Sequence, residues 1–391
     1  MDKRVAILGA GQLAKYLAFA AKKLKISVTV IATSELEPAC LDGNRRMVFP
    51  WTPELFLKVF QEHDLVTFEN EWISDRLLQR VREKGLLEKM FPHYECMNEV
   101  RTKWDQKKFF SKQKYPTTKA VLGSSVDFLK IESFKNINDQ FSNGVVLKES
   151  ELAYDGKGVF VFKAQEQSLI FEKAQELIQK GKTWYLEERV DFQKEMALVF
   201  SRNTRGEFTH YPLVEFQSEN GICSSVYVEK KDTLEAHKLE QQAVEIARDL
   251  SQKIKWVGTA AIEFFVGPKQ ELLINEFAPR VHNSGHFSLS ASSTSQFENH
   301  MRAITGLTLG DCKTAPFAMM KNLIGTKDSK FSHPPEKQEG VELFWYGKHE
   351  IRPGRKMGHV TAFGSLDQKS QIISKVDETV EKWKLATILG A

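Results

Sequence analysis

The chain has 391 residues, of which 41% are hydrophobic and 27% are charged, and its formal net charge is +4. This length predicts two or three domains, and the balanced charge argues against a general nucleic-acid-binding protein. The sequence contains no apolar run near the ~18 residues that a membrane-spanning helix needs. The four cysteines are scattered, with no CxxC pair and no secretory signal. A cytoplasmic protein with reduced thiols and no membrane partner is therefore expected.

The N-terminal residues follow the order of a strand, a glycine-rich turn and a helix. Residues 5–8 are apolar, residues 9–14 read GAGQLA, and a helical pattern continues to about residue 23. The glycines allow a tight turn and the close approach of an anion to the helix N-terminus. Glu35 and Glu37 follow where a dinucleotide-binding domain places its ribose-binding acid. Doubly wound domains that bind no nicotinamide share this pattern, so both interpretations stay open.

Acidic residues follow the predicted strand at residues 65–68. Glu69 and Glu71 lie at its carboxyl end, the edge where open α/β sheets bind ligands, although an exposed acidic loop is the alternative. Residues 99–113 predict one charged helix at a domain junction, ended before Pro116. Two short basic pairs are interpreted as solvated faces of helices, namely Lys22-Lys23 and Lys107-Lys108.

A second glycine-containing loop follows a strand that ends in a lysine. Residues 144–148 predict that strand, with Lys148 at its end, and residues 154–158 read YDGKG before another predicted strand. Such a loop can fold over phosphates through its backbone N–H groups and one ammonium. The alternative is an ordinary hairpin with a polar tip, because Asp-Gly is also a common turn signal.

Two carboxylates, Glu263 and Glu276, lie thirteen residues apart on two predicted strands. Residues 267–270 between them read GPKQ, which predicts a hairpin that brings the two side chains together. Adjacent carboxylates repel unless a cation lies between them, and Mg²⁺ bridging nucleotide phosphates is the usual solution. Two solvated glutamates on an exposed sheet face are the alternative.

Two polar stretches complete the pattern. Residues 275–286 read NEFAPRVHNSGH, which predicts a cluster of polar groups at the end of a strand and on the following loop. Farther on, four cations occur within nine residues, namely Lys348, Arg352, Arg355 and Lys356. Guanidinium groups meet phosphate oxygens in a fixed fork, so this loop suits a phosphate monoester, with a solvated basic turn as the alternative.

With these motifs in view, the chain resembles ATP-grasp enzymes, and among them the 5-(carboxyamino)imidazole ribonucleotide synthetase family of purine biosynthesis. The resemblance extends from about residue 5 to about residue 364. It is carried above all by residues 275–286 and 352–359, with support from GxGQL, YDGKG and YPLVE at residues 9–13, 154–158 and 211–215.

The resemblance implies an α/β fold that is α+β overall. An N-terminal doubly wound parallel-sheet domain would span residues 1–104, an ATP-grasp domain of two subdomains residues 105–310, and a small C-terminal β-rich domain residues 311–391. The implied activity is carboxylation of 5-aminoimidazole ribonucleotide with bicarbonate through carboxyphosphate, with ATP and Mg²⁺ as cofactors. The partners would be these small molecules.

The resemblance also implies the residues of the site. The catalytic residues would be Arg280, His282, Asn283, Tyr154 and Asp155. ATP would be bound by Lys103, Lys148, Ala153, Tyr154, Asp155, Gly156, Lys157, Gly158, Glu187, Glu188, Val190, Glu195, Asn275 and Glu276. The ribonucleotide would be bound by Glu69, Glu71, Lys348, Arg352 and Arg355, and the metal ion by Glu263 and Glu276.

Some positions depart from the family pattern. Leu152 and Ala153 replace two glycines, which stiffens the loop that follows, and Phe216 and Ser218 replace an asparagine and a histidine. The alternatives are therefore a diverged ligase for another amine or carboxylate and a non-catalytic nucleotide-binding relative. A nicotinamide oxidoreductase would leave the carboxylate pair without a role. A homodimer is expected, because dimers are the commonest assemblies.

Overall fold

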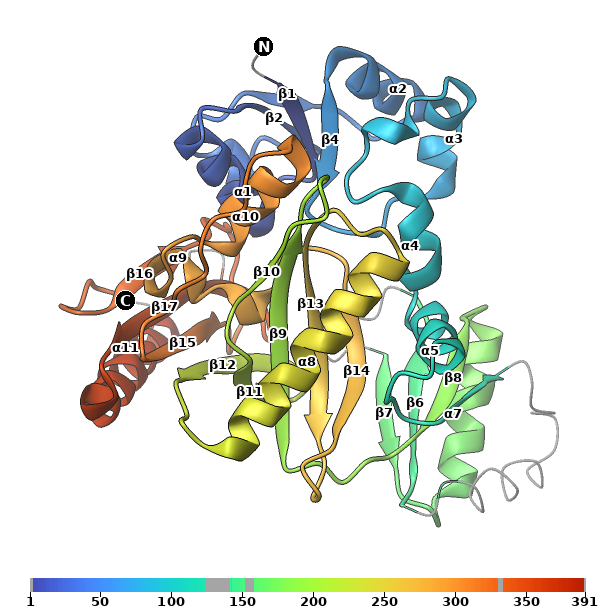
Figure 1. Cartoon of the computed structure of the whole chain (residues 1–391), viewed down its shortest axis with the longest axis vertical. Coiled ribbons are helices and arrows are strands. Elements are labelled where there is room, and N and C mark those ends of the chain that lie inside the picture. Colours follow the sequence, from blue (N-terminus) through green and yellow to red (C-terminus); the bar gives the residue numbers. More distant parts are fainter. Residues whose placement is uncertain (1–2, 124–140, 142, 152–157, 330–332, 390–391) are drawn as a thin grey trace.

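The computed structural model describes residues 3–123, 141, 143–151, 158–329 and 333–389 (Figure 1). Its strands are β1 (Arg4–Leu8), β2 (Ser27–Ala32), β3 (Arg46–Val48), β4 (Leu65–Phe68), β5 (Ala120–Leu122), β6 (Val145–Glu149), β7 (Val159–Phe162), β8 (Trp184–Glu188), β9 (Lys194–Arg202), β10 (Phe208–His210), β11 (Val214–Glu219), β12 (Ile222–Glu229), β13 (Gly258–Val266), β14 (Leu272–Ala278), β15 (Phe317–Ile324), β16 (Glu342–Trp345) and β17 (Lys356–Gly364).

The helices cover these sheets and connect them. The α-helices are α1 (Gln12–Lys23), α2 (Pro53–Glu62), α3 (Asp75–Glu83), α4 (Tyr94–Val100), α5 (Lys103–Lys112), α7 (Gln167–Gln179), α8 (Leu234–Lys253), α9 (Ser288–Ala291), α10 (Gln296–Thr305) and α11 (Lys369–Leu389). Short 3₁₀ turns are η1 (Pro38–Cys40), η2 (Leu87–Lys89), η4 (Asn283–Gly285) and η5 (Leu366–Gln368). Across the described residues, every helix is too short or too polar to cross a membrane.

The N-terminal sheet is parallel, with the strand order β3-β2-β1-β4. Side chains alternate along β1, so its two faces bury different residues. Val5 and Ile7 pack in one core with Leu17 of α1, whereas Ala6 and Leu8 pack in another core with residues of α2. Helices therefore cover both faces, which confirms the doubly wound fold expected from the sequence.

The central sheet is antiparallel and runs in the order β14-β13-β9-β11-β12-β15-β17-β16, with β10 paired to β9. The C-terminal strands β15 to β17 continue this sheet, because β15 pairs with β12. Helix α8 lies across β9, β13 and β14, while α11 lies beside β15 and β17 at the other end (Figure 1). The C-terminal strands are thus joined to the rest of the central sheet by backbone hydrogen bonds.

A smaller antiparallel sheet, in the order β5-β8-β6-β7, is separate from the central sheet. Helix α7 covers it and buries Ile170, Ala174 and Leu177 against the strands. The helical residues fall at the spacing that gives one apolar face. The sheet carries Lys148, which bonds Asn275 of β14, and Glu187, which pairs with Lys107 of α5, so both residues lie where the smaller sheet meets the rest of the protein.

The charged pattern at residues 99–113 forms two helices, so the prediction of one helix is wrong. Helix α4 ends at Val100, and α5 begins at Lys103. The hydroxyl group of Thr102 accepts a hydrogen bond from the backbone N–H of Asp105 at 3.0 Å. This cap satisfies an N–H group in the first turn and starts a new helix.

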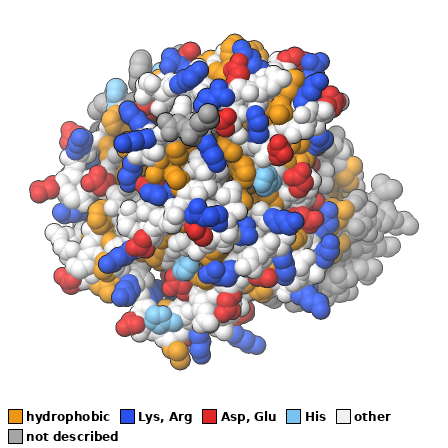
Figure 2. Space-filling model, turned by 45° about the horizontal axis from the view of Figure 1, so that its top comes forward, with side chains coloured by type: hydrophobic (Ala, Val, Ile, Leu, Met, Phe, Trp, Pro, Cys, Tyr) orange, Lys and Arg blue, Asp and Glu red, His pale blue; other side chains and the backbone are white. Residues whose placement is uncertain are grey.

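Charge is mixed over the surface drawn in Figure 2, where Lys and Arg side chains alternate with Asp and Glu side chains. Lys22 and Lys23 of α1 are exposed, as predicted for a solvated helix face. This arrangement matches the near balance of charges in the composition.

Candidate active site

The two central carboxylates lie opposite each other in the hairpin of β13 and β14. The turn is closed by a hydrogen bond from the Gly267 N–H to the Glu271 carbonyl at 3.0 Å. The register pairs Glu263 with Glu276, which confirms the pairing predicted from their spacing. Strand β14 extends to Ala278, so Glu276 and Asn275 lie within the strand rather than beyond its end.

The two carboxylates have different neighbours, a lysine beside Glu276 and a histidine beside Glu263. The Lys103 ammonium donates to Glu276 Oε2 at 2.6 Å, and His282 Nε2 lies 3.3 Å from Glu263 Oε1. Burial raises the pKa of Glu263, and the Glu276 carboxylate adds to this rise. Burial also opposes ionisation of Glu276, but the Lys103 ammonium outweighs it and lowers the pKa of that carboxyl. The two carboxyls are therefore unequal: Lys103 stabilises the charged form of Glu276, whereas ionisation of Glu263 beside it is disfavoured without a further cation.

This imbalance fits a divalent cation between the two carboxylates. Within the described residues, His, Cys, Asp and Glu side chains form no group of three or more that could hold a metal ion by themselves. Mg²⁺ commonly takes only one or two protein carboxylates and completes its shell with phosphate oxygens and water. Two paired glutamates are consistent with this small number of protein ligands.

A buried ion cluster connects α5 with the smaller sheet. The Lys107 ammonium lies 3.1 Å from Glu187 Oε2, and the Lys148 ammonium pairs with Glu187 Oε1. The side chains of Lys107 and Glu187 are only 3% and 2% exposed. The interpretation of Lys107 as part of a solvated helix face is therefore wrong. It faces inward because α5 packs against β14. Thr118 also accepts a bond from its ammonium group at 2.7 Å.

The pKa values of this cluster follow from burial and charge. Burial lowers the pKa of Lys107 to about 8, despite the attraction of Glu187. Burial alone would raise the pKa of Glu187, but Lys107 and Lys148 together lower it to about 2. Lys148 also donates to Asn275 Oδ1 at 3.1 Å, so the cluster reaches β14.

The loop after β14 carries the arginine and the histidines. The Arg280 guanidinium donates from Nε to Glu71 Oε2 at 2.7 Å, which brings a predicted substrate residue to this loop. His282 Nδ1 lies 2.8 Å from the Ser284 hydroxyl, and Asn283 begins the short turn η4. Burial lowers the pKa of His282 far below its usual range, and the positive charge of Arg280 lowers it further. The imidazole is therefore neutral.

The glycine-rich turn of the N-terminal domain holds a carboxylate of the chain itself. Glu69 accepts hydrogen bonds from the backbone N–H groups of Gly11 at 2.6 Å and Ala14 at 3.1 Å. A Cβ atom at Gly9 would lie 2.5 Å from the Glu69 side chain, so glycine is needed for this approach. Glu37 caps its own loop through the N–H of Thr33 at 2.8 Å. The N–H groups of this turn, which could bind the phosphate of a dinucleotide, bond the Glu69 carboxylate instead.

The other residues predicted to bind the nucleotide lie on β8 and β9 or between them. Glu188 ends β8, Val190 follows it, and Glu195 lies on β9. Burial raises the pKa of Glu195, while a hydrogen bond from Ser218 opposes the rise. Phe216, the neighbouring departure from the family pattern, packs in a hydrophobic core. The predicted loop residues outside the described part of the chain are Ala153, Tyr154, Asp155, Gly156 and Lys157, together with Leu152; Gly158 lies at its end with φ of +71°.

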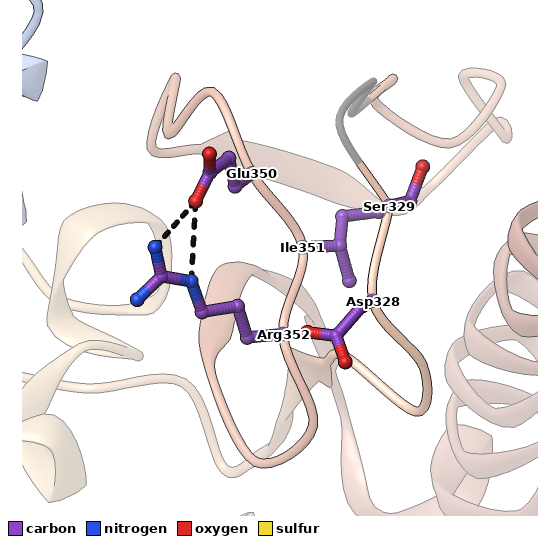
Figure 3. Close-up of a pocket in the computed structure, with 5 residues that line it drawn as sticks. All are labelled: Asp328, Ser329, Glu350, Ile351 and Arg352. Atoms are coloured by element: carbon purple, nitrogen blue, oxygen red, sulfur yellow. Dashed lines mark hydrogen bonds and ion pairs between the residues drawn. The ribbon is translucent and has the colours of Figure 1, made fainter.

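The C-terminal basic loop is more exposed than the carboxylate pair. Figure 3 shows the guanidinium group of Arg352 turned toward Glu350, to which it donates from Nε at 3.1 Å. Glu350 and Arg352 line a pocket together with Asp328, Ser329 and Ile351. Arg355 donates to the Glu350 carbonyl at 2.9 Å, and Lys348 donates to a nearby backbone carbonyl at 2.7 Å.

Sequence reasoning missed four residues of the site. Lys356 is close enough for its charge to lower the pKa of His282, although the sequence placed it only among the loop cations. Lys107 neutralises Glu187, and the buried amides of Gln106 and Gln296 bond to the backbone of β14 and its loop. Lys356, Lys107 and Gln106 meet partners on distant segments, and Gln296 bonds backbone groups, so no local pattern could have identified them.

Known proteins share the sequence and the fold. A family model of the ATP-grasp domain matches residues 112–297, and a model of the phosphoribosylaminoimidazole carboxylase C-terminal domain matches residues 318–372. N5-carboxyaminoimidazole ribonucleotide synthase of Saccharolobus solfataricus is 32% identical over 379 residues, which cover 96% of each chain. The enzyme of the same name from Synechococcus elongatus is 33% identical over 370 residues, which cover 92% of this chain and 89% of that one.

A solved structure matches the whole arrangement. The crystal structure of carboxyaminoimidazole ribonucleotide synthase from Aspergillus clavatus, complexed with ATP, superimposes with a TM-score of 0.83 at 26% identity. The match covers 98% of this chain and 99% of that one. The likeness therefore includes the parallel N-terminal sheet, both ATP-grasp subdomains and the C-terminal strands.

Proposed function

This chain belongs to the N5-carboxyaminoimidazole ribonucleotide synthase family of ATP-grasp ligases, and from that premise we propose how its own residues perform the reaction. ATP and bicarbonate react first, and 5-aminoimidazole ribonucleotide then accepts the carboxyl group. The single observation that carries this proposal is the pairing of Glu263 and Glu276 beside the loop of Arg280 and His282.

The first step activates bicarbonate, which is a poor electrophile. A bicarbonate oxygen attacks the γ-phosphorus of ATP, the bond from that phosphorus to the ADP oxygen breaks, and carboxyphosphate forms. The Lys103 and Lys148 ammonium groups stabilise the negative charge on the transferred phosphoryl group. Mg²⁺ held by Glu263 and Glu276 would supply further neutralisation of that charge.

The loop after β14 binds the one-carbon anion. The Arg280 guanidinium presents two parallel N–H groups, which match two oxygens of bicarbonate. Its bond to Glu71 holds the guanidinium group in place through Nε. Because the pKa of His282 is lowered far below neutrality, its imidazole is a weak base, and we assign it an orienting role.

The second step forms the carbon–nitrogen bond. The exocyclic amine of the ribonucleotide attacks the carboxyl carbon, phosphate leaves, and the amine loses a proton, which gives the carbamate. Lys348, Arg352 and Arg355 are assigned to the 5′-phosphate of the ribonucleotide, because guanidinium and ammonium groups suit that dianion. Glu69 and Glu71 approach the aminoimidazole end. Tyr154 and Asp155 keep their predicted catalytic roles on the loop.

A coupled assay of ADP release tests this function. With 5-aminoimidazole ribonucleotide present, ADP release should depend on bicarbonate, and one carbamate should form for each ADP. ADP release without carbamate would contradict the proposal. A panel of other amines in the same assay would reveal a diverged acceptor, because a better substrate would give the higher kcat/KM.

The cellular setting and assembly are part of the proposal. The reduced thiols favour the cytoplasm, since Cys40, Cys96 and Cys312 are buried and unpaired with one another. We propose a homodimer, as the commonest assembly of soluble enzymes. Light scattering of the purified protein would report its mass, and a monomer of 44.7 kDa would contradict the dimer.

A further inference from the structure

Strand β14 lies at the end of its sheet, so one of its edges has no neighbouring strand among the described residues. Backbone N–H and C=O groups on such an edge require other partners. Near the start of the strand, the Ile274 N–H donates to the Pro116 carbonyl at 2.7 Å, and the Thr117 hydroxyl donates to the Ile274 carbonyl at 2.8 Å. Near the end of the strand, directly after Glu276, the backbone groups bond to a side chain instead.

That partner is the buried amide of Gln106 on α5, which is 4% exposed. Its Oε1 accepts from the Phe277 N–H at 2.9 Å, and its Nε2 donates to the Phe277 carbonyl at 2.8 Å. The second hydrogen of Nε2 reaches the Val100 carbonyl at 2.8 Å. The amide thus bonds both backbone groups of one residue, as a neighbouring strand would, and all its donors are used.

Five residues later, Gln296 of α10 makes the same kind of bond with His282. Its Oε1 accepts from the His282 N–H at 2.8 Å, and its Nε2 donates to the His282 carbonyl at 2.6 Å. Gln296 is completely buried, and Nε2 also lies 3.0 Å from His286 Nδ1. The same Nδ1 lies 2.9 Å from the His282 carbonyl, so Gln296, His282 and His286 form one buried polar cluster.

We propose that Gln106 and Gln296 are positioning residues for the reaction, which fix the backbone on both sides of Arg280. This inference rests on the function proposed above. Gln106 fixes the peptide that follows Glu276, and Gln296 fixes the peptide of His282. The segment between Phe277 and His282 therefore cannot rotate without breaking two bonds at one of its ends. Displacements of about 1 Å in such a segment can reduce turnover by about 100-fold.

Gly285 provides a second sign that the position of Gln296 is specific. A Cβ atom at Gly285 would lie 2.7 Å from Gln296 Oε1 and 2.8 Å from Gln296 Cδ. Its backbone φ lies outside the left-handed region, so the absence of a side chain is needed for space rather than for conformation. The Gly285→Ala substitution should therefore displace the amide without straining the turn η4.

The chain offers a matched control on the same helix. Asn299 of α10 is completely buried, and its amide also bonds both backbone groups of one residue, accepting from the Gly310 N–H at 2.8 Å and donating to the Gly310 carbonyl at 3.3 Å. Gly310 lies outside the catalytic segment, a name we use for residues 276–282. Gln296→Met and Asn299→Leu each remove an amide and keep the size of the side chain, so both should lower the melting temperature.

The two variants should differ in kinetics at a temperature where both are folded. Gln296→Met should lower kcat by about 100-fold and raise KM for bicarbonate, whereas Asn299→Leu should keep kcat within about threefold of the unaltered enzyme. Gly285→Ala should reproduce the rise in KM for bicarbonate if Gln296→Met fails to fold. Equal losses of kcat in Gln296→Met and Asn299→Leu, or an unchanged KM for bicarbonate in Gly285→Ala, would overturn the role of Gln296.

The role of Gln106 has a readout that needs no turnover. Calorimetric titration with ATP and Mg²⁺ should show Gln106→Met binding about tenfold more weakly, with Gln296→Met within about twofold of the unaltered protein. Unchanged ATP affinity in Gln106→Met would refute its role. Failure of the proposed function would appear separately, as ADP release that ignores bicarbonate in the unaltered enzyme.

Discussion

The catalytic segment and the C-terminal basic loop both gather charge, but they hold it in opposite ways. In the segment, Glu276 is bonded to Lys103 at 2.6 Å and the backbone is fixed by buried amides. In the loop, the side chain of Arg352 is 65% exposed and pairs with Glu350, whose side chain is 46% exposed. Buried charges are costly to leave alone, whereas exposed pairs contribute about 0–1 kcal/mol. The segment should therefore govern turnover and stability, and the loop should govern substrate affinity.

The largest effect should come from Glu276→Gln. Removal of the negative charge should reduce kcat on the order of 10²–10³-fold, because Glu276 holds the cations that stabilise the transferred phosphoryl group. Steady-state ADP release would measure this loss. Glu229→Gln is the matched control, since Glu229 at the end of β12 also pairs with a lysine, Lys369, at 2.6 Å. If both variants lost turnover equally, the distinction between the segment and an ordinary ion pair would disappear.

The second effect concerns stability. Glu187→Gln leaves the ammonium groups of Lys107 and Lys148 buried without their anion, so the free energy of unfolding should fall by about 3–5 kcal/mol. Chemical denaturation would measure it. A fall below about 1 kcal/mol would mean that this cluster behaves like an exposed ion pair.

The third prediction concerns the basic loop. Arg355→Ala should raise KM for the ribonucleotide by about 10–100-fold with little change in kcat, because a charge-assisted bond of about 1.5–3 kcal/mol is lost. Arg352→Ala should raise KM by only about threefold, since its exposed guanidinium already pairs with Glu350. A large loss of kcat in either variant would show that the loop acts in the chemical step.

The smallest effect is a pH dependence. The pKa of Lys107 is lowered to about 8 from its ordinary value of 10.5, so the unfolded chain binds more protons between these values. The contribution of Lys107 to the free energy of unfolding should therefore rise as pH increases from 8 toward 10.5. Denaturation at several pH values should show that the free energy of unfolding rises more steeply with pH in the unaltered protein than in Lys107→Met. Parallel curves would contradict the lowered pKa.

Local patterns predicted the parts of the structure that local contacts determine. The GPKQ turn predicted the hairpin and therefore the pairing of Glu263 with Glu276, because few residues separate the strands. The glycine-rich turn was predicted as well, but not the carboxylate that occupies it. Glu69 arrives from 58 residues away, so its approach depends on the order of strands in the sheet.

The inward direction of Lys107 could not be predicted for the same reason, since its partner Glu187 lies on a distant strand, β8. The amides of Gln106 and Gln296 give no sequence signal either, because glutamine is common on exposed helices and their targets are backbone groups. The carboxylate pair and the cations could thus be predicted by residue type and by family resemblance. The bonds that orient them depend on contacts between distant elements.

The most direct measurement of the central claim follows oxygen from bicarbonate into phosphate. When ATP, the ribonucleotide and ¹⁸O-labelled bicarbonate react on the enzyme, one labelled oxygen should appear in each released phosphate, because carboxyphosphate carries that bridging oxygen away from carbon. Phosphate that contains no label, while ADP still forms, would show that bicarbonate is never phosphorylated and would contradict the account.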